Sequence, residues 1–311
     1  MPGGIHPPLA VIESWPTPNY VDPHTRGWSL VILMCVLYAI ALLAVVARLW
    51  ARLGILHNAG ADDAIIVAAM VPATAMTITI GLASRKYGFD RHVWDVPLPV
   101  LKQNRKATFA IECFYVLGTT LTRISILFFY RRMAAGSVSK SFLWAVRASI
   151  VFVIAYGITF EVTLFASCTP FHAFWQEIDP TWAATHKHRC TDEGANLYAA
   201  SVVSVVQDLI TCLLPTMLFW KLQLPRRQKI ALGAIFGVGF FLCIAGILRI
   251  YYIHFTFYET YDVTWAGQDN WIWTGVEALL GIVCASAPAL KVFVRRYTNF
   301  SGFGSGVDEN G

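Results

Sequence analysis

Six ionisable side chains lie inside long apolar stretches of this sequence, where water cannot solvate them. They are Glu112, Arg123, Glu161, Asp208, Arg249 and Glu277. An ionised carboxylate in hydrocarbon costs several kcal/mol unless an opposite charge pairs with it or a proton neutralises it. Each of these side chains is therefore a candidate for ligand binding, proton relay or the locking of one helix to another.

The composition identifies the class of protein that surrounds these charges. Of the 311 residues, 56% are hydrophobic and only 14% are charged, whereas a soluble domain carries about 25% charged residues. Seven apolar segments have the length of about 20 residues that crosses a bilayer, at 28–46, 64–83, 107–130, 142–167, 197–220, 230–254 and 271–294. None has the strict alternation of a barrel strand, so helices must satisfy the backbone in lipid. We predict an all-α membrane protein, a bundle of seven transmembrane helices.

The distribution of basic residues predicts the orientation of this bundle. Lysine and arginine are more frequent in the loops after the first, third and fifth segments, and after the seventh, than on the other side. By the positive-inside rule the N-terminus is outside and the C-terminus is cytosolic. We predict an extracellular segment at 1–27, a seven-helix domain at 28–296 and a short disordered cytosolic tail at 297–311. The net charge of +5 reflects topology, and we expect lipid, not nucleic acid, as the surrounding partner.

Depth along the predicted helices separates the six charges into two groups. At about 1.5 Å per residue, an outer band contains Glu112, Glu161, Arg249 and Glu277. Arg123 and Asp208 lie near mid-membrane, where they would form an ion pair that costs less than either charge alone. Such a pair either locks helices together or serves as a switch. In the outer band three carboxylates face one arginine, which favours a cavity for a cationic ligand, or a protonated or hydrated carboxylate.

Cysteines and histidines mark the predicted outer loop between the fourth and fifth segments. Thiols outside the cell tend to pair, and a Cys168–Cys190 disulfide would fold this loop into a lid. Cys113 is a competing partner, because sequence alone does not fix connectivity. A zinc site is a further alternative, formed by Cys190 with His172, His186 and His188, although the spacing lacks the tight pairs of structural sites.

Another pair of charged residues, at the start of the second segment, is compatible with an ordinary structural role. Asp62 and Asp63 begin the second segment, where carboxylates cap a helix and complement its dipole. A role in cytoplasmic coupling is the alternative.

The sequence contains no P-loop, G-x-S-x-G, H-E-x-x-H or dinucleotide motif, so we expect no enzyme and no cofactor. A retinal Schiff base needs a lysine midway along the seventh helix, and Lys291 lies about 13 Å from that centre at about 1.5 Å per residue.

Several motifs together resemble a known family. The run "DLITCLLPTMLFWKLQLPRRQKIALGAIFGVGFFLCIAGILRI" is similar to the central region of the fungal rhodopsin-domain integral membrane proteins, which include Pth-type receptor-like proteins. Further matches are "ARLGILHNAGADDAII", "LTRISILFFYRRM", "CTPFHAFW" and "WTGVEALLGIVCASAPALK". Together the motifs stand in the order of the family and cover the chain from about Trp28 to Arg296. The matching polar positions are Asp63, Arg123, Asp208, Arg249 and Glu277. The resemblance implies a receptor-like role without retinal.

We therefore expect a receptor-like sensor of an extracellular cue in the plasma membrane. A small ligand would enter the outer band, and the change would pass through Arg123 and Asp208 to basic loops at 131–132 and 226–227. Those loops would contact an acidic cytosolic signalling partner. The alternatives are a proton-coupled small-molecule transporter, which buried carboxylates would suit, and a structural membrane protein.

Overall fold

The computed structural model describes residues 5–134, 140–219 and 226–300, with the backbone alone described at 134, 216–219, 226–232, 234–236 and 289–300. Of the predicted tail at 297–311, residues 297–300 are helical and residues 301–311 lie outside the described residues. The side chains of the predicted basic site at 226–227 are also outside the described set. The long helices are α2 (Ser29–Leu49), α3 (Ala61–Arg85), α4 (Leu98–Ala134), α5 (Lys140–Phe165), α8 (Glu193–Phe219), α9 (Arg226–His254) and α10 (Val263–Phe300). Short elements are α1 (Leu9–Ser14), η1 (Trp50–Ile55), η2 (Val93–Asp95), α6 (Ala173–Gln176), α7 (Pro180–Thr185), η3 (Phe255–Glu259) and the strands β1 (Cys168–Thr169) and β2 (Arg189–Cys190).

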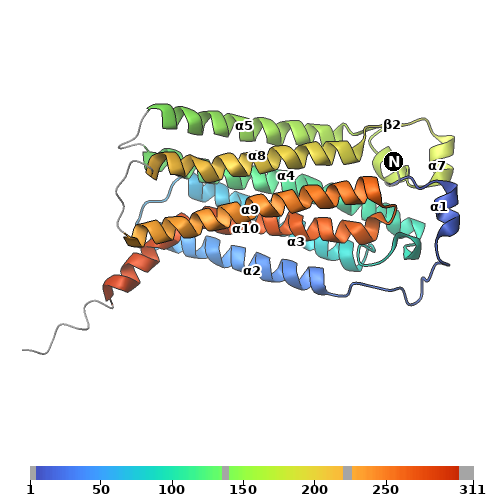
Figure 1. Ribbon diagram of the computed structural model, residues 1–311, viewed down its shortest axis with the longest axis horizontal. Helices are drawn as coiled ribbons and strands as arrows, with labels where there is room; N and C mark the ends of the chain where they lie inside the picture. Colours follow the sequence, from blue (N-terminus) through green and yellow to red (C-terminus); the bar gives the residue numbers. More distant parts are fainter. Residues whose placement is uncertain (1–4, 135–139, 220–225, 301–311) are drawn as a thin grey trace, which may run out of the picture.

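The seven long helices run side by side as one elongated bundle (Figure 1). Within the described part of the chain, all seven are long and apolar enough to cross a membrane. The predicted fold class is therefore confirmed. Helices α4 and α10 are the most buried spans, and α10 packs against α2, α4 and α9 while α4 packs against α3 and α5. These two central helices carry four of the buried charges, Arg105, Glu112 and Arg123 on α4 and Glu277 on α10.

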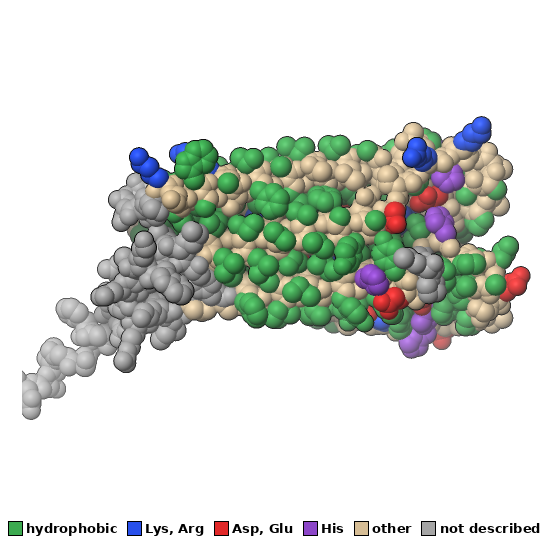
Figure 2. Space-filling view, turned by 45° about the horizontal axis from the view of Figure 1, so that its top comes forward, with side chains coloured by type: hydrophobic (Ala, Val, Ile, Leu, Met, Phe, Trp, Pro, Cys, Tyr) green, Lys and Arg blue, Asp and Glu red, His purple; other side chains and the backbone are tan. Residues whose placement is uncertain are grey.

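The outer surface of the bundle is apolar. Large hydrophobic side chains are exposed along α2, α5 and α9, including Leu43, Val151 and Phe240, and they form a continuous band over the middle of the bundle (Figure 2). An apolar surface this large would promote aggregation in water. It is the surface that a helical membrane protein presents to lipid.

The bundle has two different ends. The first, which we call the disulfide end, carries the N-terminal segment, α1, α7 and the β1–β2 pair (Figure 1). The second, the C-terminal end, is where α10 continues beyond its neighbours. Exposed carboxylates and histidines gather toward the disulfide end (Figure 2). Which end faces the cytosol remains a prediction.

The predicted disulfide is confirmed. Cys168 and Cys190 are bonded and pair across β1 and β2. Cys113 is a free thiol, so the competing Cys113–Cys190 pairing is wrong. The bond also removes the thiolate that the zinc alternative required of Cys190, because only a thiolate binds the metal. The loop contains α6 and α7, and Phe174 of α6 is buried in a small cluster with Cys168 and Ala173.

Candidate functional site

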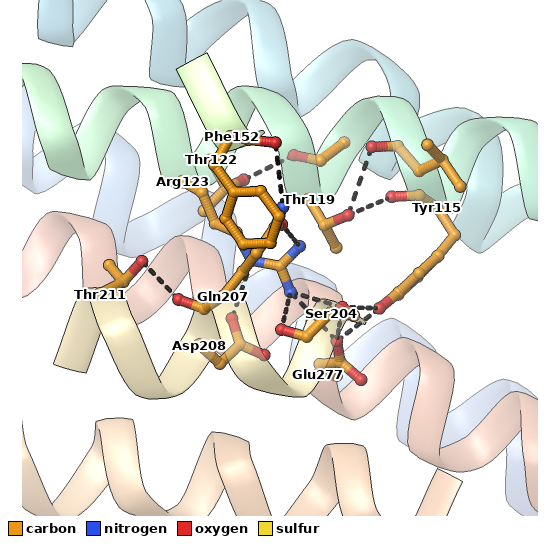
Figure 3. Close-up of polar contacts among 12 residues, drawn as sticks. Tyr115, Thr119, Thr122, Arg123, Phe152, Ser204, Gln207, Asp208, Thr211 and Glu277 are labelled. Carbon is orange, nitrogen blue, oxygen red and sulfur yellow. Dashed lines mark hydrogen bonds and ion pairs between the residues drawn. The ribbon is translucent and has the colours of Figure 1, made fainter. Parts of the chain in front are cut away.

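A network of ion pairs lies in the middle of the bundle, around Arg123 of α4. Its guanidinium is buried and places Nε 2.8 Å from Asp208 Oδ1, and Nη2 donates to Ser204 Oγ at 2.6 Å. Nη1 donates to Gln207 Oε1 at 3.2 Å. The three partners share one face of α8 because residues three and four apart are neighbours on a helix. The residues that the sequence pairs, Arg123 and Asp208, are thus in direct contact (Figure 3).

Glu277 of α10 joins this network to a second arginine. Its Oε1 lies 3.4 Å from Arg123 Nη2, and its Oε2 lies 3.0 Å from Arg249 Nε. Tyr115 donates its hydroxyl to the same carboxylate and has the Arg249 guanidinium over its ring at 4.3 Å. The sequence assigns Glu277 and Asp208 to separate bands, and that separation is wrong. Both belong to one network of two arginines and two carboxylates.

A cavity of about 50 Å³ lies beside this network. Glu112, Arg249 and Trp271 are among its lining residues, and the rest of the wall is mostly apolar, with Phe160, Leu164 and Ile253. A second cavity of about 40 Å³ adjoins the first. Glu112, Glu193, Leu197, Asn270 and Trp271 line both. Arg249 therefore contacts the cavity on one side and the mid-bundle network on the other.

Glu112 and Arg249 line this cavity as the outer-band hypothesis requires, but Glu161 does not. Glu161 is half-buried and lies beside the Cys113 thiol. It lines neither cavity, although its neighbours Phe160 and Thr163 line the first. Glu277 lies one contact away, behind Arg249. The structure thus brings together three of the four predicted residues and leaves Glu161 out.

Arg105 is a functional candidate that the sequence prediction missed. It is buried on α4 and makes two hydrogen bonds to Glu193 of α8, of 2.9 and 2.5 Å. Its guanidinium also lies over the ring of Phe174, 4.4 Å from the centroid. The third segment was predicted to begin at 107, whereas α4 begins at Leu98, so Arg105 was assigned to a loop. Because Arg105 is paired with Glu193, it does not offset the predicted excess of carboxylates over arginine in the outer band.

The N-terminal segment and the disulfide loop border the second cavity. Ile5 and Ile178 line it. Desolvation and the nearby positive charge of Arg105 lower the pKa of the His6 imidazole. Burial raises the pKa of the Glu177 carboxyl. These two segments place titratable groups where a ligand from the disulfide end would enter.

A separate cluster of charges lies toward the C-terminal end. Arg48, buried in the last turn of α2, places Nη2 2.7 Å from Asp62 Oδ2 and Nε 2.8 Å from Asp63 Oδ1. It also donates to the Ala285 carbonyl of α10 at 2.5 Å. Arg132 of α4 lies 3.1 Å from Asp62 Oδ1. Asp63 accepts the Gly60 N–H at 3.0 Å, as a capping residue does, but its pairing with Arg48 was missed because Arg48 was assigned to a loop.

Comparison with known protein families gives a match to the fungal rhodopsin domain over residues 47–296. This chain belongs to that family. The match covers α3, α4, α5, α8 and α9 entirely and most of α10, and so includes every charged residue of the mid-bundle network. No solved structure matches the chain.

Several curated fungal proteins are similar to this member of the family. A SAT4 family membrane protein of Emericella nidulans is 26% identical over 70% of this chain and 53% of its own length. Receptor GIN3 of Arthrobotrys oligospora is 26% identical over 88% of this chain and 64% of its own length. Wortmanamides biosynthesis cluster protein C of Talaromyces wortmannii is 26% identical over 63% of this chain and 50% of its own length. The chain thus spans about half to two-thirds of the length of these relatives. Their names point to membrane proteins with a receptor-like role in one case and a biosynthetic context in another.

Proposed function

We propose that this fungal rhodopsin-domain protein is a receptor-like sensor, not an enzyme, that binds a small ligand in the cavity beside Glu112. One observation carries the proposal: Arg249 lines that cavity and is ion-paired with Glu277, which also contacts Arg123. The cavity and the centre of the bundle are therefore joined by direct contacts. The similarity to a receptor over 88% of the chain is in accord with this role.

The geometry supports a specific route from ligand to bundle. A ligand that draws Arg249 toward the cavity weakens its pairing with Glu277. The freed carboxylate then interacts more strongly with Arg123, which competes with the Asp208 pair at 2.8 Å. Because these residues lie on α4, α8, α9 and α10, the exchange of partners shifts those helices against one another. A ligand changes the balance of two arrangements only by binding one of them more tightly.

We further propose that the disulfide end faces the cell exterior at the plasma membrane and the C-terminal end faces the cytosol. The disulfide supports this placement, because disulfides persist in oxidising surroundings. At the opposite end Arg131 and Arg132 close α4, and a cytosolic signalling partner of acidic character would bind there. A fluorescent protein fused to the C-terminus tests this orientation in intact cells. Quenching only by a membrane-permeant quencher would support a cytosolic C-terminus, and quenching by an impermeant quencher would contradict it.

The rival function is proton-coupled transport. Glu112, Asp208 and Glu277 are buried carboxylates on three helices, as proton relays require. A transporter in liposomes moves protons or solute without any partner, and Glu277→Gln would stop the flux. A receptor produces no flux, and neither does a purely structural membrane protein.

The experiment that tests the receptor proposal measures movement at the C-terminal end. Spin labels replace Met133 of α4, which is exposed, and Gly233 of α9, where an added side chain meets nothing within 4 Å. We expect Arg249→Gln to change the distance distribution between the labels, because it breaks the link between cavity and Glu277. Glu161→Gln is the matched control and should leave it unchanged. An unchanged distribution in folded Arg249→Gln protein would refute the proposed route.

A further inference from the structure

Glu112 is an uncompensated carboxylate within the described part of the chain. Its side chain is buried, and neither carboxylate oxygen has a hydrogen-bond partner among the described residues. The arginines nearest to it in the fold already have partners: Arg105 makes two hydrogen bonds to Glu193, and Arg249 pairs with Glu277. A proton alone would not satisfy Glu112, because the resulting O–H would lack an acceptor.

Other polar atoms on the cavity walls also lack hydrogen-bond partners in the described part of the chain, and two of them belong to residues that line both cavities. Asn270 Oδ1 is an acceptor and Trp271 Nε1 is a donor, and both are buried without a hydrogen bond among the described residues. Both residues line the two adjoining cavities, as Glu112 does. Buried polar groups are rarely left unpaired, and an orphaned group calls for an explanation. Arg249 Nη2 and Ser167 Oγ in the first cavity wall and Thr256 Oγ1 in the second also lack a hydrogen bond among the described residues. Glu112, Asn270 and Trp271 are the three described groups of this kind that line both cavities, and together they indicate a missing molecule rather than three separate defects.

The chemistry of the three groups defines that molecule. Glu112 and Asn270 offer acceptors, so they require N–H donors, while Trp271 requires an acceptor. The charges of Arg105 and Arg249 are offset by Glu193 and Glu277, so the uncompensated Glu112 leaves the cavity with a net negative charge that repels an anion. A cavity of about 50 Å³ holds about three to five groups the size of water, since one water needs about 10–15 Å³. The portion of the ligand that enters is therefore small.

We propose, resting on the sensor function above, that this cavity binds the cationic head of a small organic amine or amidine. The head donates to the Glu112 carboxylate and to Asn270 Oδ1, and an oxygen or nitrogen acceptor on the ligand receives the Trp271 indole N–H. The positive charge compensates Glu112. The acceptor on the ligand also receives an N–H of Arg249 Nη2, which is unpaired among the described residues, and this hydrogen bond draws the guanidinium toward the cavity and away from Glu277. The mostly apolar wall strengthens the charge–charge attraction by excluding water.

Three probes of one shape and size test the charge of the ligand. Acetamidinium, acetamide and acetate have the same number of heavy atoms and differ mainly in charge. We would measure the melting temperature of the protein in lipid nanodiscs at millimolar concentrations of each. We expect acetamidinium to raise the melting temperature in a concentration-dependent way, and acetamide and acetate to leave it unchanged.

Matched variants locate the binding. Glu112→Gln keeps the shape of the side chain and should weaken acetamidinium binding about ten- to a hundredfold, the usual loss for a hydrogen bond to a charged group. Glu161→Gln removes a carboxylate of the neighbouring helix that lies outside the cavity and should bind as the wild type does. If Glu112→Gln does not fold, Asn270→Leu removes the other acceptor and should weaken binding about tenfold.

Each other outcome overturns the inference in an identifiable way. Stabilisation of all variants alike by acetamidinium would mean that it binds elsewhere. Stabilisation by acetamide or acetate that Asn270→Leu abolishes would make the cavity a site for a neutral or anionic ligand, and the sensor proposal would stand. If no probe stabilises the protein, the proposal of a cationic ligand is overturned. The spin-label distances would decide the sensor proposal independently.

Discussion

The Arg123–Asp208 pair allows a quantitative test of the mid-bundle network. The two changes are Arg123→Gln and Asp208→Asn, made singly and together. Each removes a charge while keeping most of the side-chain volume. The network predicts that the two single losses in unfolding free energy are unequal, because the two residues differ in their remaining partners.

The contacts set the magnitudes. Without Arg123, Asp208 has no other partner among the described side chains, since its Oδ2 is already unbonded; the loss of one member of a buried pair costs about 3–5 kcal/mol. Without Asp208, Arg123 still contacts Ser204, Gln207 and Glu277, so we expect a loss of about 1–3 kcal/mol. The double variant should recover about 1–3 kcal/mol relative to the sum, as residues in one network do.

The assay is reversible unfolding of the four proteins in detergent micelles, followed by circular dichroism. Arg105→Gln combined with Asp208→Asn is the control, because these residues do not contact each other and their losses should add within about 0.5 kcal/mol. Additive losses for Arg123→Gln and Asp208→Asn would refute the pairing as an energetic unit. If Asp208→Asn loses more unfolding free energy than Arg123→Gln, the argument that Arg123 keeps other partners after Asp208 is removed is refuted.

Three further predictions follow from other parts of the molecule. Replacing both Cys168 and Cys190 by alanine should lower the unfolding free energy by about 3 kcal/mol, because the bond closes a loop with a sequence separation of 22. Equal melting temperatures of the wild type with and without reductant would contradict this prediction. Arg48→Gln should lower the unfolding free energy by about 3–5 kcal/mol, because it leaves two buried carboxylates without this cation. A loss below about 1 kcal/mol in thermal unfolding would show that water solvates the cluster. The pKa of His6 is lowered in the folded protein from 6.5, so contact of the N-terminal segment is favoured above that pH and weakens as pH falls below it. The protection factors for hydrogen exchange of that segment, which correct for the pH dependence of intrinsic exchange, should fall as pH drops below that value, and His6→Gln should abolish this fall.

The fold could be predicted from the sequence because the bilayer imposes a simple rule. Every span must satisfy its own backbone and present apolar side chains, so length and hydropathy identify the seven helices. The disulfide was one of several pairings that the sequence allowed. The Arg123–Asp208 contact followed from depth and from the cost of isolated charges, which leaves few alternatives within an apolar stretch.

The prediction failed where charged residues lie at the ends of helices. Arg48 and Arg105 were read as loop residues because hydropathy falls around them, yet both are buried inside helices. Helix α4 begins nine residues before its apolar segment, and nothing in "LPVLKQNRK" after its proline interrupts a helix. Each arginine is buried because a carboxylate from another helix meets it, and that long-range pairing is invisible to a window of local sequence.

The same two helices connect the mid-bundle network to the cluster at the C-terminal end. Arg123 and Arg132 lie on α4, about 13 Å apart at about 1.5 Å per residue, and Arg132 contacts Asp62. Glu277 and Ala285 lie on α10, about 12 Å apart by the same rise, and the Ala285 carbonyl accepts from Arg48. A displacement of α10 along α4 would therefore stretch contacts in both clusters at once. The proposed coupling would need no chain of intervening side chains, because two rigid helices would carry it. It would require two stable arrangements of these helices, and in the proposed route the exchange of Glu277 between two arginines would supply the difference between them.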